Sequence, residues 1–321
     1  MKLNSSNMLF YYTLILGMLT TISSNNWMMM WAGLEISLMS FIPLMSGGIK
    51  GSESSMKYFI IQSMSSSLLM LSILLMMVKL NYNYMICVSL LIKMGVAPMH
   101  NWILSIVNGL DYISLFMLLT IMKIGPLTLL SYINQNIELF IMTSLIFGSI
   151  LGLNQNSIRK VMSYSSIYNM GYIISVINKN MIWFLYLMMY SVVLMMIILL
   201  LKKLKINYLN QFMINDMSLE SKMSMWISML SLGGMPPFLG FFPKLMIIQM
   251  MLTNNMIFIV VLMILSSLVV MFFYIRMMFV MLISYSMMMK WNLLKVNKIS
   301  FIYMSMNIFM FPVMVLTKSL T

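Results

Sequence analysis

Residues 89–102 read SLLIKMGVAPMHNW, an apolar stretch that contains Lys93, Pro98 and the only histidine of the chain, His100. A proline inside a helix removes one backbone hydrogen bond and clashes with the preceding turn. A charged side chain in such a helix costs free energy unless it faces a protein interior or a wet cavity. The combination therefore predicts an interrupted helix that carries a working site.

The composition of the whole chain indicates an all-α polytopic membrane protein. Of its 321 residues, 62% are hydrophobic and 8% are charged, whereas a soluble domain usually has about 25% charged residues. The net charge is +13, but the basic residues are spread singly along apolar segments. Nucleic-acid binding requires a basic patch, so it is not expected, and membrane orientation explains the charge better.

Scarce thiols and imidazoles limit the redox chemistry of the chain. It contains one cysteine, Cys87, and one histidine. These counts exclude an internal disulfide, a four-thiolate iron–sulfur cluster and a bis-histidine haem. We therefore expect no cofactor and no metal to be bound by this chain.

Residue usage suggests where the gene lies. The chain has 48 methionines but only two alanines and two arginines. This usage is typical of an AT-rich gene read with a code in which AUA means methionine, as in many animal mitochondria. We predict mitochondrial encoding. The alternative, methionine as a general core filler, does not explain the scarcity of alanine.

The length of the apolar segments predicts the number of membrane spans. A helix needs about 20 residues to cross a bilayer core, which predicts about eleven spans, at 5–23, 26–46, 56–79, 83–105, 113–133, 136–155, 160–178, 180–201, 223–251, 256–283 and 299–317. With this count, twelve lysines and arginines fall on the N-terminal side and three on the other. The positive-inside rule then predicts that the N-terminus faces the matrix.

Charged residues within the predicted spans are candidates for function. Glu35, Lys93 and Lys123 lie near the middle of their spans, where a charge costs about 2.5–3.5 kcal/mol. Glu35 and Lys93 have opposite charge and similar depth, so we expect them to form an ion pair. The pair is either static or changes its protonation during function. Arg276 lies nearer a helix end, from which its side chain can reach the interface.

A second interruption is predicted in the segment LGGMPPFLGFFPK, residues 232–244. Its helix-breaking residues precede another buried lysine, Lys244; they are Gly233, Gly234, Pro236 and Pro237. Freed backbone carbonyls at membrane depth must be buried in protein or line a cavity. We therefore expect a site beside Lys244 as well.

The two interruptions lie an odd number of spans apart, so the helices that carry them run in opposite directions. This predicts two inverted five-helix repeats, 1–133 and 134–283, each with a discontinuous fourth helix, near 93–98 and 233–244. A basic loop and a C-terminal helix follow at 284–321. Secondary transporters with this layout bind ions near the bilayer midplane.

The residue types beside the breaks favour proton movement. Lysine ammonium groups are poor ligands for metal cations, but a buried lysine can act as a proton carrier. His100 can feed protons to Lys93, or it can simply form a structural hydrogen bond at the helix break. The sequence leaves both readings of His100 open.

Five segments carry a resemblance to a known family. They are WAGLEISLMSFIPL (31–44), ESSMKYFIIQS (53–63), KMGVAPMHNW (93–102), GLNQNSIRKVMSYSSIYNMGY (152–172) and SLGGMPPFLGFFPK (231–244). In this order they resemble the antiporter-like membrane subunits of respiratory complex I, NADH:ubiquinone oxidoreductase, which are related to multisubunit cation/proton antiporters. Full-length members usually have fourteen spans, so the resemblance implies that the eleven spans predicted here correspond to such a member without its first three.

The resemblance implies a proton-translocating role. It pairs Glu35 with Lys93, and it makes Lys123 a central relay lysine and Lys244 the lysine of the second broken helix. Electron transfer from NADH through FMN and iron–sulfur clusters to ubiquinone would take place elsewhere in the complex. The implied location is the mitochondrial inner membrane, and the implied partners are other membrane-arm subunits and lipids, including cardiolipin at the basic matrix loops.

Two other classes stay open. A free-standing cation/proton antiporter would need further deep carboxylates for sodium, and Glu35 is the only acidic residue within the predicted spans that lies deep. A structural scaffold would tolerate apolar replacement of the buried charges.

Overall fold

The computed structural model describes residues 5–78, 83–133, 135–178, 181–214, 219–286, 300–309 and 312. Within these residues the regular elements are helices, and one isolated bridge pairs Ser157 with Tyr208. The chain divides into two compact units, Met1–Phe140 and Ile141–Thr321. The all-helical architecture predicted from composition is confirmed for the described residues.

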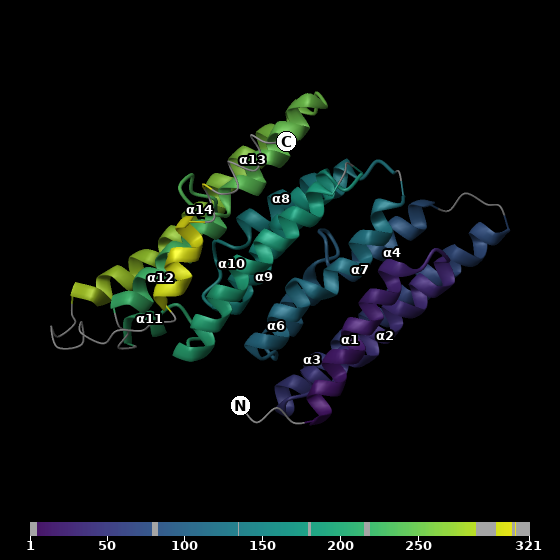
Figure 1. Cartoon of the computed structure of the whole chain (residues 1–321), viewed down its shortest axis with the longest axis horizontal. Helices are drawn as coiled ribbons and strands as arrows, with labels where there is room; N and C mark the ends of the chain where they lie inside the picture. Colours follow the sequence, from purple (N-terminus) through teal and green to yellow (C-terminus); the bar gives the residue numbers. More distant parts are fainter. Residues whose placement is uncertain are drawn as a thin grey trace. The chain divides into compact units, whose positions relative to one another are not determined.

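The first unit is built from seven helices among its described residues. They are α1 (Ser5–Ser23), α2 (Trp27–Met45), α3 (Gly48–Met77), α4 (Asn83–Met94), α5 (Asn101–Val107), α6 (Tyr112–Leu119) and α7 (Ile121–Ser131). Helix α2 packs against α1 and α3, and α3 also packs against α4 and α5; Figure 1 shows α1, α2 and α3 as one group of helices. Small residues permit the close packing of α1 on α2, since a Cβ added to Gly17 would lie 2.7 Å from the backbone nitrogen of Ser37.

The second unit contains the later helices. They are α8 (Glu138–Ile150), which begins just before the division, α9 (Ile158–Ser175), α10 (Ile182–Leu204), α11 (Gln211–Ile214), α12 (Leu219–Gly233), α13 (Phe241–Thr253), α14 (Ile257–Ser286) and a helix at Ser300–Phe309. Helix α9 is buried around almost its whole circumference although it carries serines, tyrosines and Asn169. A helix buried on all sides usually is apolar, so α9 brings polar groups into the interior of this unit.

Among the described residues, five helices or helix pairs are long and apolar enough to cross a membrane: Trp27–Met45, Gly48–Met76, Tyr112–Ser131, Ile182–Leu204 and Ile257–Met281. The predicted spans 83–105 and 223–251 each contain two helices separated by a break, α4 and α5 in the first and α12 and α13 in the second. The last predicted span, 299–317, lies partly outside the described residues.

The predicted span 113–133 corresponds to the candidate span Tyr112–Ser131, within which the helix is interrupted at Thr120. Helix α6 ends before Thr120, whose backbone leaves helical geometry at φ −123° and ψ −73°. The backbone N–H and the hydroxyl of Thr120 both donate to the carbonyl of Phe116. This local bonding by a threonine side chain competes with continuation of the helix, and α7 restarts at Ile121.

Candidate functional site

The break between α4 and α5 holds the first candidate site. Gly95 has φ +67°, and a Cβ added there would lie 2.1 Å from Cδ1 of Ile103, so this position favours glycine in both conformation and space. The peptide bond between Ala97 and Pro98 is cis. The chain therefore leaves α4 immediately after Lys93 and Met94 and re-enters a helix at α5.

Two side chains bind the carbonyls that the break exposes. Trp102 Nε1 donates to the carbonyl of Ile92 at 3.1 Å, and Gln62 Nε2 donates to the carbonyl of Lys93 at 3.2 Å. The last carbonyls of a helix lack partners within the helix. Gln62 and Trp102 therefore satisfy the end of α4 without using the ammonium group of Lys93.

The ammonium group of Lys93 faces the carboxylate of Glu35 instead. Lys93 Nζ lies 3.6 Å from Glu35 Oε1, and the two side chains are 4% and 22% exposed. Glu35 Oε1 accepts no hydrogen bond, and 3.6 Å exceeds normal hydrogen-bond length. The contact is an ion pair between a buried lysine and a carboxylate that reaches the surface of its unit.

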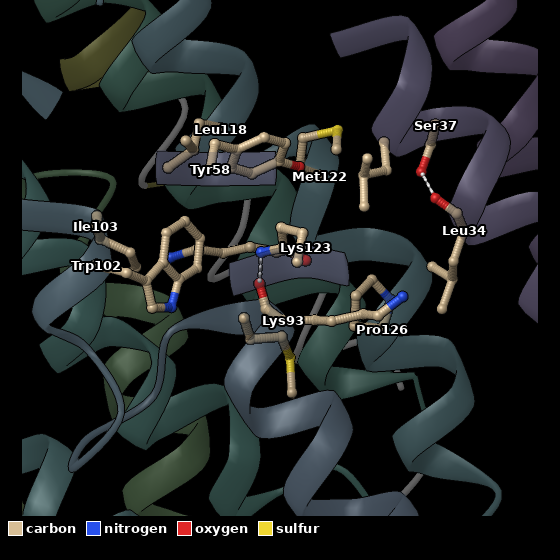
Figure 2. A pocket seen from close by; sticks show the side chains of 13 residues that line it. Leu34, Ser37, Tyr58, Lys93, Trp102, Ile103, Leu118, Met122, Lys123 and Pro126 are labelled. Atoms are coloured by element: carbon tan, nitrogen blue, oxygen red, sulfur yellow. Dashed lines mark hydrogen bonds between the residues drawn. The ribbon is translucent and has the colours of Figure 1, made fainter. Parts of the chain in front are cut away.

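Lys93 and Lys123 line one small cavity, shown in Figure 2. Its volume is about 20 Å³, and its polar lining also includes Ser37, Tyr58 and Gln62. A cavity of this size and polarity has room for about one water molecule. Lys123 lies on α7 and is buried. The structure thus brings two of the predicted relay lysines to the same polar space within the first unit.

The break between α12 and α13 holds the second candidate site. Lys244, on α13, donates from Nζ to the carbonyls of Leu232 at 3.0 Å and Gly233 at 2.8 Å, at the end of α12. The carbonyl end of a helix carries a partial negative charge. In the described part of the chain no carboxylate forms an ion pair with Lys244. The ammonium group is therefore held by a helix end and lies 5.4 Å from the centre of the Tyr168 ring, a cation–π contact.

Glycines keep this second site open to the lysine. Gly234 has φ +91°, and a Cβ added there would lie 2.9 Å from Lys244 Nζ. A Cβ added to Gly240 would lie 1.8 Å from the carbonyl oxygen of Ser231. The predicted breakers Gly233, Gly234, Pro236 and Pro237 all fall at the end of α12 or in the segment that follows it.

A second cavity of about 20 Å³ lies beside Lys244 and is lined by Asn169, Tyr186, Tyr190 and Ser231 among others. Tyr186 donates from its hydroxyl to Asn169 Oδ1 at 2.9 Å. The hydroxyl of Tyr190 is buried and forms no hydrogen bond of normal geometry, although Asn169 lies near it. An ammonium group has three donors, and two of those of Lys244 bind α12. The third can serve a water in this cavity.

The remaining predicted residues lie apart from these cavities. The Nδ1 atom of His100 is hydrogen-bonded to the carbonyl of Pro98 at 3.2 Å, and His100 is not among the residues that line the cavity of Lys93 and Lys123. Arg276 donates from Nη2 to the carbonyl of Gln155 at 3.1 Å. Among the described residues, no group of three or more His, Cys, Asp or Glu side chains could hold a metal ion.

Four contributors at these sites were not predicted: Gln62, Trp102, Asn169 and Tyr190. Gln62, Trp102 and Asn169 lie inside the sequence segments that carry the family resemblance, so the resemblance could have indicated them as site residues. Tyr190 lies in an apolar run of α10, where the sequence offers no sign that it lines the cavity beside Lys244.

Comparison with known proteins identifies relatives of the chain. The family described as NADH:quinone oxidoreductase/Mrp antiporter, TM, matches residues 24–83 and 77–271. NADH-ubiquinone oxidoreductase chain 2 of Anopheles gambiae is 42% identical over 260 residues, which cover 76% of each chain. The protein of the same name from Locusta migratoria is 40% identical over 262 residues, covering 77% of this chain and 76% of that protein.

Solved structures show the same fold. A chain of respiratory complex I from Thermus thermophilus, with bound aureothin, superimposes with a TM-score of 0.80 at 19% identity, covering 87% of this chain and 71% of that chain. A chain of the Mrp complex from Dietzia sp. DQ12-45-1b superimposes with a TM-score of 0.75 at 14% identity, covering 84% of this chain and 59% of that chain.

Proposed function

Because the chain belongs to the NADH:quinone oxidoreductase/Mrp antiporter transmembrane family, we propose that it serves as a proton-translocating membrane-arm subunit of respiratory complex I. The observation that carries this proposal is the ion pair of the buried Lys93 with Glu35 beside an interrupted helix. A buried ammonium group is costly, and its position next to a second buried lysine supports a functional role.

In the first unit the proposed relay runs between Lys93 and Lys123. Both line one cavity of about 20 Å³, which has room for about one water molecule. The interaction between two charges rises steeply as the dielectric constant falls. A positive charge on Lys123 therefore makes the protonated form of Lys93 less stable, whereas the carboxylate of Glu35 makes it more stable. Moving a proton on one group changes the free energy of protonation of its neighbours.

In the second unit Lys244 is the proposed proton carrier. Its ammonium group is stabilised by the end of α12, and its third N–H can reach a water in the cavity of Tyr190. A proton given up by Lys244 can pass to that water while the amine keeps hydrogen bonds to the carbonyls. This part of the relay needs no carboxylate.

The finer architecture is part of the same proposal. We place eleven spans in the membrane, with inverted repeats at 1–133 and 134–283 and the N-terminus in the matrix. NADH, FMN, iron–sulfur clusters and ubiquinone would act in other subunits of the complex, and no redox centre is assigned to this chain. Mitochondrial encoding follows from the residue usage, and anionic lipids such as cardiolipin would bind at the basic matrix side.

A free-standing cation/proton antiporter is the second candidate, because a chain of an Mrp complex shares the fold. Purification distinguishes the two. A complex I subunit is expected in a large NADH-oxidising assembly, whereas a free-standing antiporter would purify without NADH-oxidising activity.

The relay itself is tested by Lys93→Ala in the assembled complex, with Lys57→Ala as the matched control. Lys57 also pairs with a glutamate, Glu53, but both side chains are exposed. We expect Lys93→Ala to lower proton pumping at least about tenfold, because the variant lacks the ammonium group that carries the proton in the proposed relay. Lys57→Ala should retain normal pumping. Normal pumping in assembled complex carrying Lys93→Ala would refute the relay.

A further inference from the structure

Two tyrosines of α9, Tyr168 and Tyr172, lie one turn apart, and both side chains are fully buried. The hydroxyl of Tyr172 donates to the carbonyl of Met263 on α14 at 2.9 Å, and the hydroxyl of Tyr168 donates to the hydroxyl oxygen of Tyr172 at 3.0 Å. A tyrosine hydroxyl has a single proton. Because the bond to α14 uses the proton of Tyr172, its oxygen is left to accept the proton of Tyr168.

This chain of two hydrogen bonds ends at a backbone carbonyl. An amide carbonyl accepts hydrogen bonds but has no proton to pass on, so the chain is suited to holding a side chain in place and not to carrying protons. The side chain at its other end is Tyr168, whose ring centre lies 5.4 Å from Lys244 Nζ. An ammonium group is attracted to the negative face of such a ring.

The ring of Tyr168 is held at both its ends. At the backbone, a Cβ added to Gly148 on α8 would lie 2.6 Å from the nitrogen of Tyr168, so α8 packs directly on α9 at this position. At the far end, the hydroxyl is bound by Tyr172, and the two tyrosine rings meet edge to face with centres 5.2 Å apart. The face that Tyr168 presents to Lys244 therefore depends on Tyr172.

Tyr172 also supports the cavity beside Lys244. Its ring stacks on that of Tyr186, with centres 6.0 Å apart and planes 13° from parallel. Tyr186 in turn donates to Asn169, and both of these residues line the cavity. Tyr172 does not line the cavity itself, so any influence that it has on Lys244 is exerted through its neighbours.

We propose that Tyr172 is a positioning residue for Lys244, acting through the ring of Tyr168. The cation–π contact stabilises the ammonium form of Lys244 but not the neutral amine, so the placement of this ring changes the free energy of protonating Lys244. Without the hydroxyl of Tyr172, the buried hydroxyl of Tyr168 loses its acceptor, and the ring must turn to find another. The proposal rests on the role of Lys244 as a proton carrier given under the proposed function.

The test is Tyr172→Phe in the whole assembled complex, which keeps the ring that stacks on Tyr186. The matched control is Tyr274→Phe, because Tyr274 is equally buried but its hydroxyl forms no hydrogen bond of normal geometry. We expect Tyr172→Phe to lower the turnover number of coupled NADH oxidation about threefold. The KM values for NADH and ubiquinone should not change, because both substrates would bind in other subunits. Tyr274→Phe should turn over as the wild type does.

A second variant, Tyr168→Phe, separates positioning from general support of the fold. It keeps the ring and the bond from Tyr172 to α14, but it removes the donor that binds Tyr172. We expect it to lose about as much turnover as Tyr172→Phe, and the double variant to lose no more than either single one. If Tyr172 only ties α9 to α14, the threefold loss should recur when Tyr172→Phe is added to Tyr168→Phe, and the positioning role would be rejected.

A structure of the Tyr172→Phe complex gives the geometric readout. The distance between Lys244 Nζ and the centre of the Tyr168 ring, 5.4 Å in this chain, should increase. An unchanged distance, or normal turnover in Tyr172→Phe, would overturn the proposal and leave the Lys93→Ala test untouched, since Lys93 belongs to the first unit. Normal pumping in Lys93→Ala would instead reject the proposed function, whatever Tyr172→Phe shows.

Discussion

At the end of α4 the exposed carbonyls are bound by Gln62 and Trp102, whereas at the end of α12 they are bound by the ammonium group of Lys244 itself. In the first unit the lysine precedes the break and is left to face a carboxylate. In the second unit it follows the break and turns back onto the helix that has just ended. The same residue type beside the same kind of interruption thus has a different counter-charge in each unit.

This difference predicts different sensitivities. A carboxylate carries a full negative charge that a proton can remove, whereas a helix end carries about half a charge that is fixed in place. The charge state of Lys93 should therefore depend on the chemistry of Glu35. The charge state of Lys244 should depend on the geometry of the break, which the glycines at 234 and 240 maintain.

Among the variants that leave Glu35 and the lysines in place, the largest effect is expected for Gly234→Ala. The new Cβ would lie 2.9 Å from Lys244 Nζ, so the ammonium group must shift, and we expect its hydrogen bonds to the carbonyls of α12 to weaken. The matched control is Gly48→Ala, because Gly48 also has a positive φ, +79°, but nothing lies within 4 Å of an added Cβ. Both variants carry similar backbone strain.

We expect Gly234→Ala to lower proton pumping about tenfold, which corresponds to roughly 1.4 kcal/mol, and Gly48→Ala to leave it near normal. The measurement is pumping per NADH oxidised in assembled complex. Equal effects of the two variants would mean that backbone strain, and not displacement of Lys244, limits the second site.

A smaller effect is expected for Gln62→Met, which keeps the volume of the side chain but removes its donor. The carbonyl of Lys93 would lose its partner, at a cost of about 1–3 kcal/mol for a buried polar group. The ammonium group of Lys93 would then bind its own helix end, as Lys244 does, and leave Glu35. We expect about fivefold lower pumping.

The control for Gln62→Met is a structure of the variant complex. The Lys93 Nζ to Glu35 Oε1 distance, 3.6 Å in this chain, should increase. If the pair stays together and pumping is normal, Gln62 does not hold Lys93 toward Glu35.

The smallest effect is expected for Tyr190→Phe. It removes one hydroxyl from the cavity beside Lys244, and an ordered water there would lose one of its partners. We expect pumping to fall about twofold. Tyr274→Phe is the matched control, since the hydroxyl of Tyr274 is also buried without a hydrogen bond but does not line this cavity. A larger loss in Tyr274→Phe than in Tyr190→Phe would contradict the placement of the water.

The sequence predicted the parts of the two sites that depend on local chemistry. Lys93, Lys244 and Glu35 are visible because charges are rare in apolar spans, and the breaks are visible because glycine and proline cluster there. The break at Thr120 was missed, since it depends on one hydroxyl bonding its own turn. Gln62 was missed because it lies 31 residues from the carbonyl it binds, and only packing of α3 against α4 brings the two together.

The different partners of the two lysines, a carboxylate for Lys93 and a helix end for Lys244, also could not be predicted from the sequence. Both motifs combine a lysine with glycine and proline, and nothing in those residues says whether the ammonium group faces a carboxylate or a helix end. That choice depends on whether other donors already occupy the carbonyls. In the first unit Gln62 and Trp102 do so, and their approach is set by tertiary structure.

The most direct test is a double-mutant cycle of Glu35→Gln and Lys93→Gln, measured as proton pumping in fully assembled complex. If the pair acts as a working unit, each single variant should lose at least about tenfold, and the double variant should lose no more than the worse single variant. Independent, additive losses would mean that Glu35 and Lys93 act separately. Normal pumping in the double variant would contradict the proposed relay outright.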